Sequence, residues 1–218
     1  MPSAPTISMT RIESIAQSPD RAGRYLVKFS DGTVMRLYRQ TVEDFGLYPG
    51  LELSDEKLAS LRDHAGAVGA KMRAVRIVSA ASVSARDLEQ RLVHKGEDPE
   101  QAKAAVEWME ELKLVDDRET ACQIVSRCAA RGYGLSRAKQ ALYEKQIPRE
   151  YWEDALSDYP DQTEYIMKFL RSKLTDLSDP KQKKRAVDAL MRRGHHFGAV
   201  RRCLELLGED LQEFSEDL

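Results

Sequence analysis

The chain of 218 residues has few of the features that mark membrane, secreted and metal-binding proteins. Its three cysteines, Cys122, Cys128 and Cys203, are an odd number without a CxxC pair, so neither a disulfide framework nor a zinc site is indicated. No run of about 18 apolar residues is present, which excludes a membrane-spanning helix. Residues 1–10 lack the basic start and apolar centre of a secretory signal. We therefore expect a cytoplasmic protein that does not contact a membrane.

Catalytic and cofactor-binding groups are also scarce. Neighbouring side chains on a regular helix diverge by about 100°, so His195 and His196 could not chelate one metal from such a helix. The segment 131–135 holds two glycines but follows an expected helix, and it lacks the lysine of a phosphate-binding loop. Cys128 has no base nearby and fits a core position. We expect no enzymatic activity, no cofactor and no metal.

Acidic and basic residues nearly balance, at a formal charge of −2, but they are segregated along the chain. From Lys181 to Cys203 there are eight basic residues and a single acid, Asp188. From Leu204 to Leu218 there are six acids and no base. A basic segment therefore adjoins an acidic tail. We expect the tail to fold back over the basic segment.

The first 53 residues have the pattern of strands. Segments 24–29 and 33–38 are rich in β-branched and aromatic residues, and they flank Asp31-Gly32, a pair favoured in two-residue type I′ hairpins. Alternating apolar residues at Ile7 and Met9, together with Leu51 and Leu53 after a Pro-Gly turn, can add strands. The pattern predicts a small antiparallel sheet of three or four strands.

From Ser54 onward the apolar period becomes helical, and from Ser84 the chain repeats itself. A long helix is expected with Leu58, Leu61, Ala65, Val68, Met72 and Val75 on its buried face. Beyond it, one register aligns three leucines, Leu92, Leu142 and Leu190, at offsets of 50 and 48 residues. The same register aligns the triplets Lys95, Lys145, Arg193 and Gly96, Gln146, Gly194. Periods of this length are typical of stacked helical units.

Helix starts are marked by capping residues: Ser84 with Asp87, Asp98 before Pro99, Asp179 before Pro180, and the acidic pair Asp116-Asp117. The predicted fold is mainly α, with tandem three-helix repeats in an elongated array after a small antiparallel β subdomain, or α+β overall. The expected divisions are a β unit at 1–53, a connecting helix at 54–80, and repeats at 81–132, 133–178 and 179–218 with the acidic tail.

The basic residues of the last repeat are patterned. On a helix over 181–193, Ala186, Ala189 and Leu190 face inward, and the basic residues fall largely on another stripe. Arg201 and Arg202 lie outside the apolar face of the next helix. We expect nine residues to bind an anionic or acidic partner: Lys181, Lys184, Arg185, Arg192, Arg193, Arg201, Arg202, Arg137 and Lys145.

The sequence resembles the RecX family of regulatory proteins. The resemblance rests on three blocks of residues. The first is Leu114-Val-Asp-Asp117 with Thr120, Ala121, Val125, Gly134, Arg137, Leu142, Lys145 and Ile147. The second is Lys181-Gln-Lys183 with Leu190, Arg192-Arg-Gly194 and Val200. The third is Arg24-Tyr25, Asp31-Gly32, Leu47, Pro49-Gly50 and Leu53, similar to an N-terminal extension of some members. It departs from the family at Ala81 and Val83, where many members have arginines, and at His195, where an aromatic residue is usual.

The resemblance implies a regulator that binds the RecA filament on single-stranded DNA and restrains its recombinase, ATPase and coprotease activities. We expect it to act as a monomer. Weak direct DNA contact is compatible with that role. The alternative is a helical module that binds nucleic acid directly without a RecA partner. DNA shifts without RecA, beside RecA ATP hydrolysis with substoichiometric amounts of this protein, separate the two.

Overall fold

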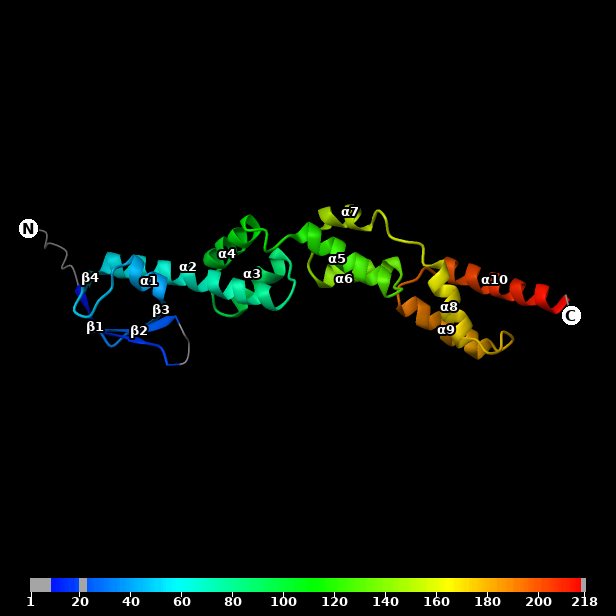
Figure 1. The fold of residues 1–218 in the computed structure, drawn as a ribbon, viewed down its shortest axis with the longest axis horizontal. Coiled ribbons are helices and arrows are strands. Elements are labelled where there is room, and N and C mark those ends of the chain that lie inside the picture. The colour runs from blue at the N-terminus through cyan, green and yellow to red at the C-terminus, as the bar shows by residue number, and fades with distance from the viewer. Residues whose placement is uncertain (1–8, 20–22, 217–218) are drawn as a thin grey trace, which may run out of the picture. The chain divides into compact units, whose positions relative to one another are not determined.

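The computed structural model describes residues 9–19 and 23–216, with side chains as far as residue 208. Figure 1 shows a small sheet followed along the chain by helices. The chain divides into two compact units. Unit 1 comprises the residues up to Ser82 together with Leu88–Val115, and unit 2 comprises Val83–Asp87 and the residues from Asp116 onward. Each unit is described by itself.

The sheet of unit 1 has four antiparallel strands in the order β3-β2-β1-β4, as the sequence predicts. The strands are β1 (Met9–Gln17), β2 (Arg24–Phe29), β3 (Val34–Tyr38) and β4 (Glu52–Ser54); Ile7 lies outside the described residues. The predicted hairpin is present, but its turn differs. Phe29 N–H donates to the Thr33 carbonyl, and only Gly32, at φ +83°, has a positive φ. The loop therefore has three residues with glycine in the left-handed position, and the predicted two-residue type I′ turn is wrong.

Helix α1 (Arg39–Asp44) and the long helix α2 (Asp55–Ala80) cover this sheet. Leu58 and Leu61 of α2 share one core with Val27, Phe29 and Leu37 of the strands. Ser54 caps α2 by accepting a hydrogen bond from the Lys57 backbone N–H at 3.3 Å. One apolar core therefore spans the division expected between residues 53 and 54.

Further along, α2 packs against α4 (Pro99–Glu111). Gln101 Nε2 donates to the Asp63 carbonyl at 3.2 Å, and a Cβ at Gly66 would stand 2.3 Å from the Gln101 side chain. The fully buried residues of this half of α2 are Ala70 and Ala74, whereas Met72 is 37% exposed. The placement of Met72 in the core was wrong, because close helix contact selects small side chains on the facing stripe.

Unit 2 contains two groups of helices, each with its own core. Helices α5 (Asp117–Ala130) and α6 (Leu135–Glu144), a 3₁₀ turn η1 (Arg149–Tyr151) and α7 (Trp152–Leu156) share the first core, which contains Leu142 and Cys128. Helices α8 (Thr163–Lys173), α9 (Pro180–Arg192) and α10 (Phe197–Glu216) share the second, which contains Leu190. The divisions expected at 132/133 and 178/179 pass between helices of one group.

The three positions that the repeat register aligns have the same backbone structure, at the C-terminal ends of α3 (Ala85–His94), α6 and α9. Leu92, Leu142 and Leu190 are fully buried. Their carbonyls accept from the N–H groups of Glu97, Ile147 and His195 at 3.1, 3.1 and 3.2 Å. The preceding residues, Gly96, Gln146 and Gly194, have φ of +88°, +55° and +84°. Each helix therefore ends in the same Schellman motif.

Several predicted caps are confirmed, and one acts elsewhere than expected. Asp98, Asp116 and Asp179 each accept backbone N–H groups at the start of their own helix. Asp117, inside the first turn of α5, instead accepts from the Ala85 N–H of α3 at 2.9 Å. Its burial raises the pKa of the Asp117 carboxyl, and that hydrogen bond opposes the rise. Among the described residues, no helix has the length and apolar character needed to cross a membrane.

Candidate binding surface

Helix α9 presents the predicted basic stripe. Asp179 accepts the Lys181 backbone N–H at 2.7 Å and Pro180 occupies the first turn, which fixes the start of the helix. Ala186 and Leu190 face the core, at 4% and 0% exposure. Five basic side chains are exposed on the other faces: Lys181, Lys184, Arg185 and Arg192, which the sequence predicts for binding, and also Lys183. Asp188, also exposed, lies among them in the sequence of the helix.

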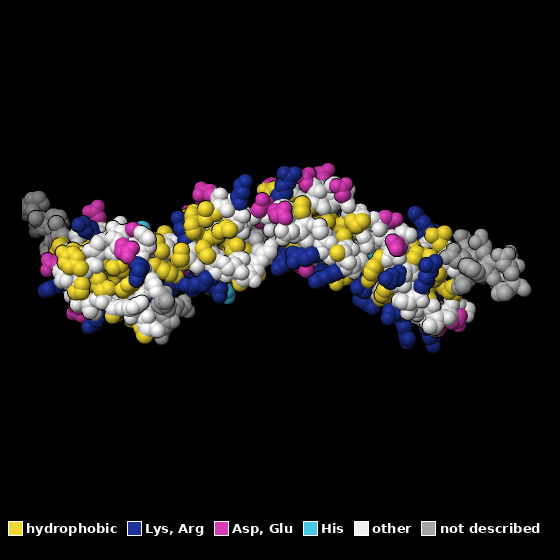
Figure 2. Space-filling model, viewed as in Figure 1, with side chains coloured by type: hydrophobic (Ala, Val, Ile, Leu, Met, Phe, Trp, Pro, Cys, Tyr) yellow, Lys and Arg dark blue, Asp and Glu magenta, His cyan; other side chains and the backbone are white. Residues whose placement is uncertain are grey.

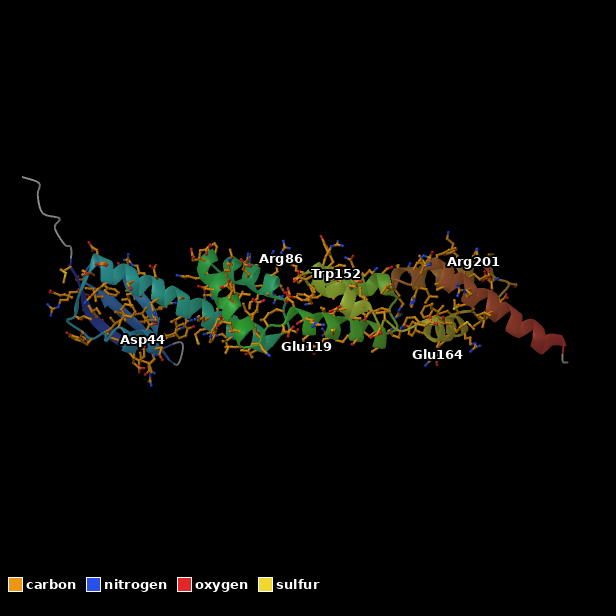
Figure 3. All side chains as sticks on the ribbon, turned by 90° about the horizontal axis from the view of Figure 1, so that it is seen from above. Asp44, Arg86, Glu119, Trp152, Glu164 and Arg201 are labelled. Carbon is orange, nitrogen blue, oxygen red and sulfur yellow. The ribbon has the colours of Figure 1, made fainter. Side chains whose placement is uncertain are left out.

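Helix α10 adds two further cations to the same group of helices. Arg201 and Arg202 are exposed, while their neighbours Val200 and Cys203 are buried. Figure 3 labels Arg201 at the surface of α10, where its Nε lies 3.1 Å from the Glu205 carboxylate. In Figure 2, dark blue Lys and Arg side chains gather over the part of unit 2 where Figure 1 places α8 and α9. We call six of the exposed cations of α9 and α10, those that the sequence predicts for binding, the basic surface: Lys181, Lys184, Arg185, Arg192, Arg201 and Arg202.

Arg193 is not part of this surface. Its guanidinium carbon lies 5.5 Å from the ring centroids of Tyr133 and Tyr165 and 5.8 Å from that of Phe169. The side chain is half-buried, and its Nε is buried without a hydrogen-bond partner. A guanidinium enclosed by aromatic rings gains cation–π attraction but is withdrawn from a polyanion. The structure thus gives Arg193 a packing role that residue type alone did not indicate.

The same region joins the two groups of helices in unit 2. Gly134 N–H donates to the Arg193 carbonyl at 2.9 Å, and Ser136 N–H to the Gly194 carbonyl at 3.2 Å. A Cβ at Gly134 would stand 2.1 Å from the Gly194 oxygen. Only residues without a side chain allow backbones to approach this closely. We call this contact the glycine junction.

His195 completes the glycine junction. It is 4% exposed, its ring stacks on Tyr165 with centroids 5.9 Å apart, and its Nε2 lies 3.1 Å from the Gly132 carbonyl. Burial lowers the pKa of His195 below the ordinary 6.5, the hydrogen bond to Gly132 opposes this, and nearby Arg193 adds to it. The imidazole of His195 therefore packs against Tyr165 as another aromatic ring would.

The two remaining predicted residues, Arg137 and Lys145, lie on the first group of helices in unit 2. Arg137 pairs with Glu144 at 2.9 Å, and that hydrogen bond lowers the pKa of the Glu144 carboxyl. A Cβ at Gly194 would meet the Arg137 backbone N at 2.3 Å, so the junction brings Arg137 to the end of α9. Lys145 is exposed at the end of α6. Sequence reasoning missed Lys139, Arg149 and Trp152, which line a cavity of this group.

The acidic tail continues α10 as a helix to Glu216 instead of folding back over α9. The reason is local, because nothing in the sequence from Glu209 to Glu216 stops a helix: it contains neither proline nor glycine. The expected fold-back is therefore not seen. The tail side chains from Glu209 onward lie outside the described residues.

Comparisons with known proteins agree with the resemblance. The model of the family "RecX, second three-helix domain" matches residues 116–156, the segment that forms α5, α6, η1 and α7. The chain is 28% identical over 158 residues to the regulatory protein RecX of Clostridioides difficile, covering 72% of this chain and 73% of that protein. It is 29% identical over 162 residues to the regulatory protein RecX of Chlorobaculum tepidum, covering 72% and 95%.

Two solved structures share the fold. The crystal structure of a regulatory protein RecX superposes with a TM-score of 0.65 at 19% identity, covering 90% of this chain and 99% of that one. The RecX structure from Lactobacillus salivarius gives a TM-score of 0.59 at 18% identity, covering 66% and 97%. The predicted helical fold and the resemblance are confirmed.

Proposed function

We propose that this chain, a protein of the RecX family, regulates the RecA recombinase by binding its filament on single-stranded DNA. Its relatives are named regulatory proteins, and that name points to a binding role. We infer RecA as the partner because proteins of the RecX family regulate RecA. Cytoplasmic residence and action as a monomer are parts of the same proposal.

The basic surface is the observation that supports the proposed mode of binding. Six cations project from α9 and α10 while the opposite faces of these helices fill a core. Of the six, only Arg201 has an ion pair within the part of the chain that the structure describes. Such a surface attracts the phosphates and carboxylates of a nucleoprotein filament, and it does so over several ångströms before contact. We infer that this binding restrains the filament, which lowers its ATP hydrolysis, strand exchange and coprotease activity.

The test is charge reversal of four members of the basic surface, Lys184, Arg185, Arg201 and Arg202, each to Glu. Affinity for RecA filaments on single-stranded DNA should fall by about tenfold or more at low salt, with the difference shrinking as salt rises. The matched control reverses four exposed cations of unit 1: Arg36, Lys57, Arg62 and Lys103. Both variants should retain the circular dichroism of the parent. Equal binding by the parent and the four-site variant would contradict the proposed surface.

A second arm separates filament regulation from direct DNA binding, which the exposed cations also favour. RecA ATP hydrolysis on single-stranded DNA is measured with substoichiometric amounts of this protein, beside gel shifts of the same DNA without RecA. Reduced hydrolysis with weak shifts supports regulation of RecA. Strong shifts without any change in hydrolysis support the nucleic-acid module instead.

A further inference from the structure

Two arginines of unit 1 converge on one tyrosine. Arg24 at the start of β2 and Tyr38 at the end of β3 are cross-strand partners in the sheet. The Arg24 guanidinium donates to the Tyr38 hydroxyl, and its carbon lies 4.4 Å from the Tyr38 ring centroid. Arg76 of α2 donates to the same hydroxyl oxygen at 3.1 Å. We call Arg24, Tyr38 and Arg76 the Tyr38 cluster. It holds two positive charges against one neutral acceptor.

Neither arginine of the Tyr38 cluster has a carboxylate partner within the described part of the chain. Their neighbours in the sequence do. Arg39 pairs with Glu43 at 4.0 Å, and Arg73 pairs with Glu97 at 2.7 Å. The Nε of Arg24 is buried and has no hydrogen-bond partner. Two like charges at one oxygen repel each other, and a buried donor without an acceptor costs free energy. An anion bound between the two guanidiniums would offset the repulsion and supply an acceptor.

The Tyr38 cluster lies at the rim of the sheet, where β3 is an edge strand. Helices α1 and α2 cover the face that buries Val27, Phe29 and Leu37 (Figure 1). Side chains alternate along a strand, so Arg24 and Tyr38 belong to the other face, and a side chain from α2 meets them at the edge. One arginine of the cluster is half-buried and the other is exposed. A ligand in solution can therefore reach both.

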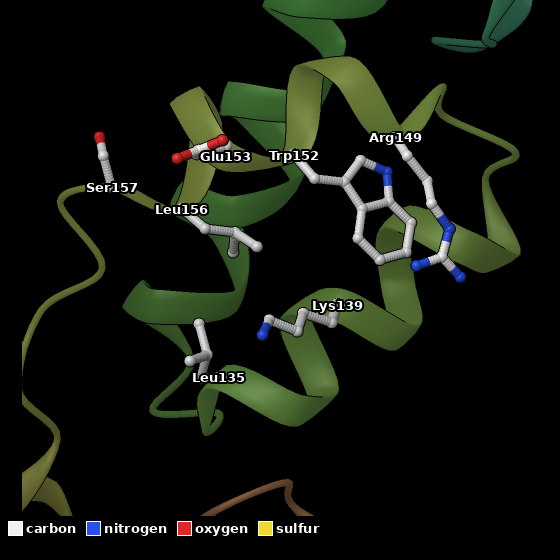
Figure 4. Close-up of a pocket in the computed structure, with 7 residues that line it drawn as sticks. All are labelled: Leu135, Lys139, Arg149, Trp152, Glu153, Leu156 and Ser157. Carbon is white, nitrogen blue, oxygen red and sulfur yellow. The ribbon is translucent and has the colours of Figure 1, made fainter.

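The cavity of about 500 Å³ in unit 2 has a different charge environment (Figure 4). Lys139 and Arg149 line it together with Glu153. The segment of η1 and α7 adds the exposed acids Glu150 and Asp154. An anion in this cavity would meet charges of both signs, whereas both guanidiniums of the Tyr38 cluster meet a neutral oxygen. The Tyr38 cluster therefore suits an anion, and the cavity does not.

Phosphate fits the arrangement of the two arginines better than carboxylate. A guanidinium presents a planar fork of N–H groups that pairs with two oxygens of one anion. Because Arg24 comes from a strand and Arg76 from a helix, an anion between them is met from two directions. A tetrahedral phosphate offers oxygens in several directions, whereas the oxygens of a carboxylate lie in one plane. The ligand class is therefore a phosphate group.

The surface around the Tyr38 cluster favours a polymer over a free nucleotide. Leu26 is half-buried and Val34 is 53% exposed on the same face of the sheet, and the Tyr38 ring already has the Arg24 guanidinium over it. A single base would find little here that encloses it or stacks on it. A nucleic-acid strand can instead lay several nucleotides across the face, and its flexible backbone can adjust to one phosphate site.

We propose that the Tyr38 cluster binds a backbone phosphate of single-stranded DNA. Arg24 and Arg76 turn N–H groups to the phosphate oxygens, and the Tyr38 hydroxyl donates its own proton to one of them. The contact is weak and independent of base sequence, because it involves one phosphate and no base edge. The cluster lies outside the basic surface, and its test uses DNA without RecA. Failure of the proposed function therefore leaves this site standing, and the reverse is also true.

The test measures the anisotropy of a fluorescent oligothymidylate with the full-length chain at about 0.15 M salt. Arg24→Gln with Arg76→Gln should weaken binding by about tenfold or more. Tyr38→Phe keeps the ring and removes the hydroxyl, and it should weaken binding by about threefold. The pair Arg24→Lys with Arg76→Lys keeps both charges but loses the planar forks, so its loss should be smaller than that of the Gln pair. The matched control, Arg36→Gln with Arg62→Gln, removes two exposed arginines of the same unit and should change the affinity by less than about twofold.

A site-resolved readout separates the Tyr38 cluster from other cations. The Nε–H NMR signals of Arg24 and Arg76, assigned with single variants that keep the circular dichroism of the parent, should shift saturably with oligothymidylate. Inorganic phosphate and thymidine monophosphate should shift them only at concentrations about tenfold higher or more, because they lack the further contacts of a strand. Four results overturn the proposal: no shift with oligothymidylate, equal losses of affinity in the Gln pair and its control, an equal response to the free phosphates, or an equal response to oligoglutamate. The third would make the cluster a site for free phosphates, and the fourth a docking site for an acidic protein.

Discussion

The ends of α6 and α9 share one backbone conformation and differ in their surroundings. Both helices close with the same hydrogen bond, from the Ile147 N–H to the Leu142 carbonyl in α6 and from the His195 N–H to the Leu190 carbonyl in α9. Lys145 at the end of α6 is exposed, whereas Arg193 in the matching position is enclosed by three aromatic rings. Lys145 and Arg193 occupy equivalent positions of the repeat, yet Lys145 is accessible to solvent and partners whereas Arg193 packs inside the protein.

The difference comes from the glycines on either side of the junction. Gly194 replaces the Gln146 of the preceding repeat, and its missing side chain lets Gly134 and Arg137 approach the end of α9. Tyr133 then comes within reach of Arg193. The exposure of a basic residue therefore depends on what its neighbours allow to pack against it, and a repeat register cannot predict that.

The largest expected effect tests what the two ends share. Leu142→Ala and Leu190→Ala each remove a fully buried side chain and should each lower the free energy of unfolding by about 2–5 kcal/mol. The measurement is urea unfolding followed by circular dichroism, with Leu206→Ala, at an exposed position, as the control. A negligible shift for either leucine would break the equivalence of the two helix ends.

The second largest effect should come from the glycine junction, which distinguishes the end of α9 from the end of α6. Gly194→Ala places a side chain at φ +84° and 2.3 Å from the Arg137 backbone N, so it should cost about 2–3 kcal/mol. Gln146→Gly at φ +55° should change stability by less than about 1 kcal/mol, since relief of the left-handed backbone offsets lost side-chain contacts. Thermal melting of both variants gives the comparison. Similar losses for both would mean that the junction adds nothing specific to α9.

The adjacent residues Arg192 and Arg193 allow an exposed and an enclosed arginine to be compared directly. Arg193→Met should destabilise the fold by about 1–2 kcal/mol through the lost cation–π contacts, while Arg192→Met should stay within about 0.5 kcal/mol. For filament binding the order should reverse at equal folding, because only Arg192 belongs to the basic surface. If Arg192→Met and Arg193→Met weakened filament binding equally, Arg193 would belong to the filament-binding residues after all.

The smallest effect concerns pH. Because the pKa of folded His195 lies below its ordinary 6.5, the unfolded chain binds the proton more readily, so stability is retained above that pH and declines as pH falls below it. Urea midpoints between pH 7.5 and pH 5 should therefore decrease toward acid. His195→Phe keeps a ring against Tyr165 and removes the titration, so its decrease should be smaller. Equal pH slopes would show that the charge of His195 plays no part.

Local sequence chemistry predicted much of the fold. The strands, most helix caps and the register of Leu92, Leu142 and Leu190 follow from short-range patterns that depend on neighbours within a few residues. The three-residue hairpin loop and the Met72 position were missed, since a turn subtype and a close helix contact depend on backbone geometry across elements. The division into repeats stays a prediction.

The candidate site, like the fold, could be predicted from the sequence only in part. The positions of Lys184, Arg185 and Arg201 outside the core could be predicted, because helical periodicity fixes which residues share a face. The cavity at Lys139, Arg149 and Trp152 could not, because its walls come from α6 and from the segment of η1 and α7. Its residues form no pattern on either element alone.

The sequence by itself determined that this chain forms a small sheet and repeated helices with a basic and an acidic end, because periodicity, capping and charge are written along the chain. Only the tertiary structure decided which cations remain available to a partner. Arg192 and Arg193 are neighbours of one residue type, yet the second is enclosed by Tyr133, Tyr165 and Phe169. Burial depends on side chains that meet across helices, and no pattern along one helix contains that information.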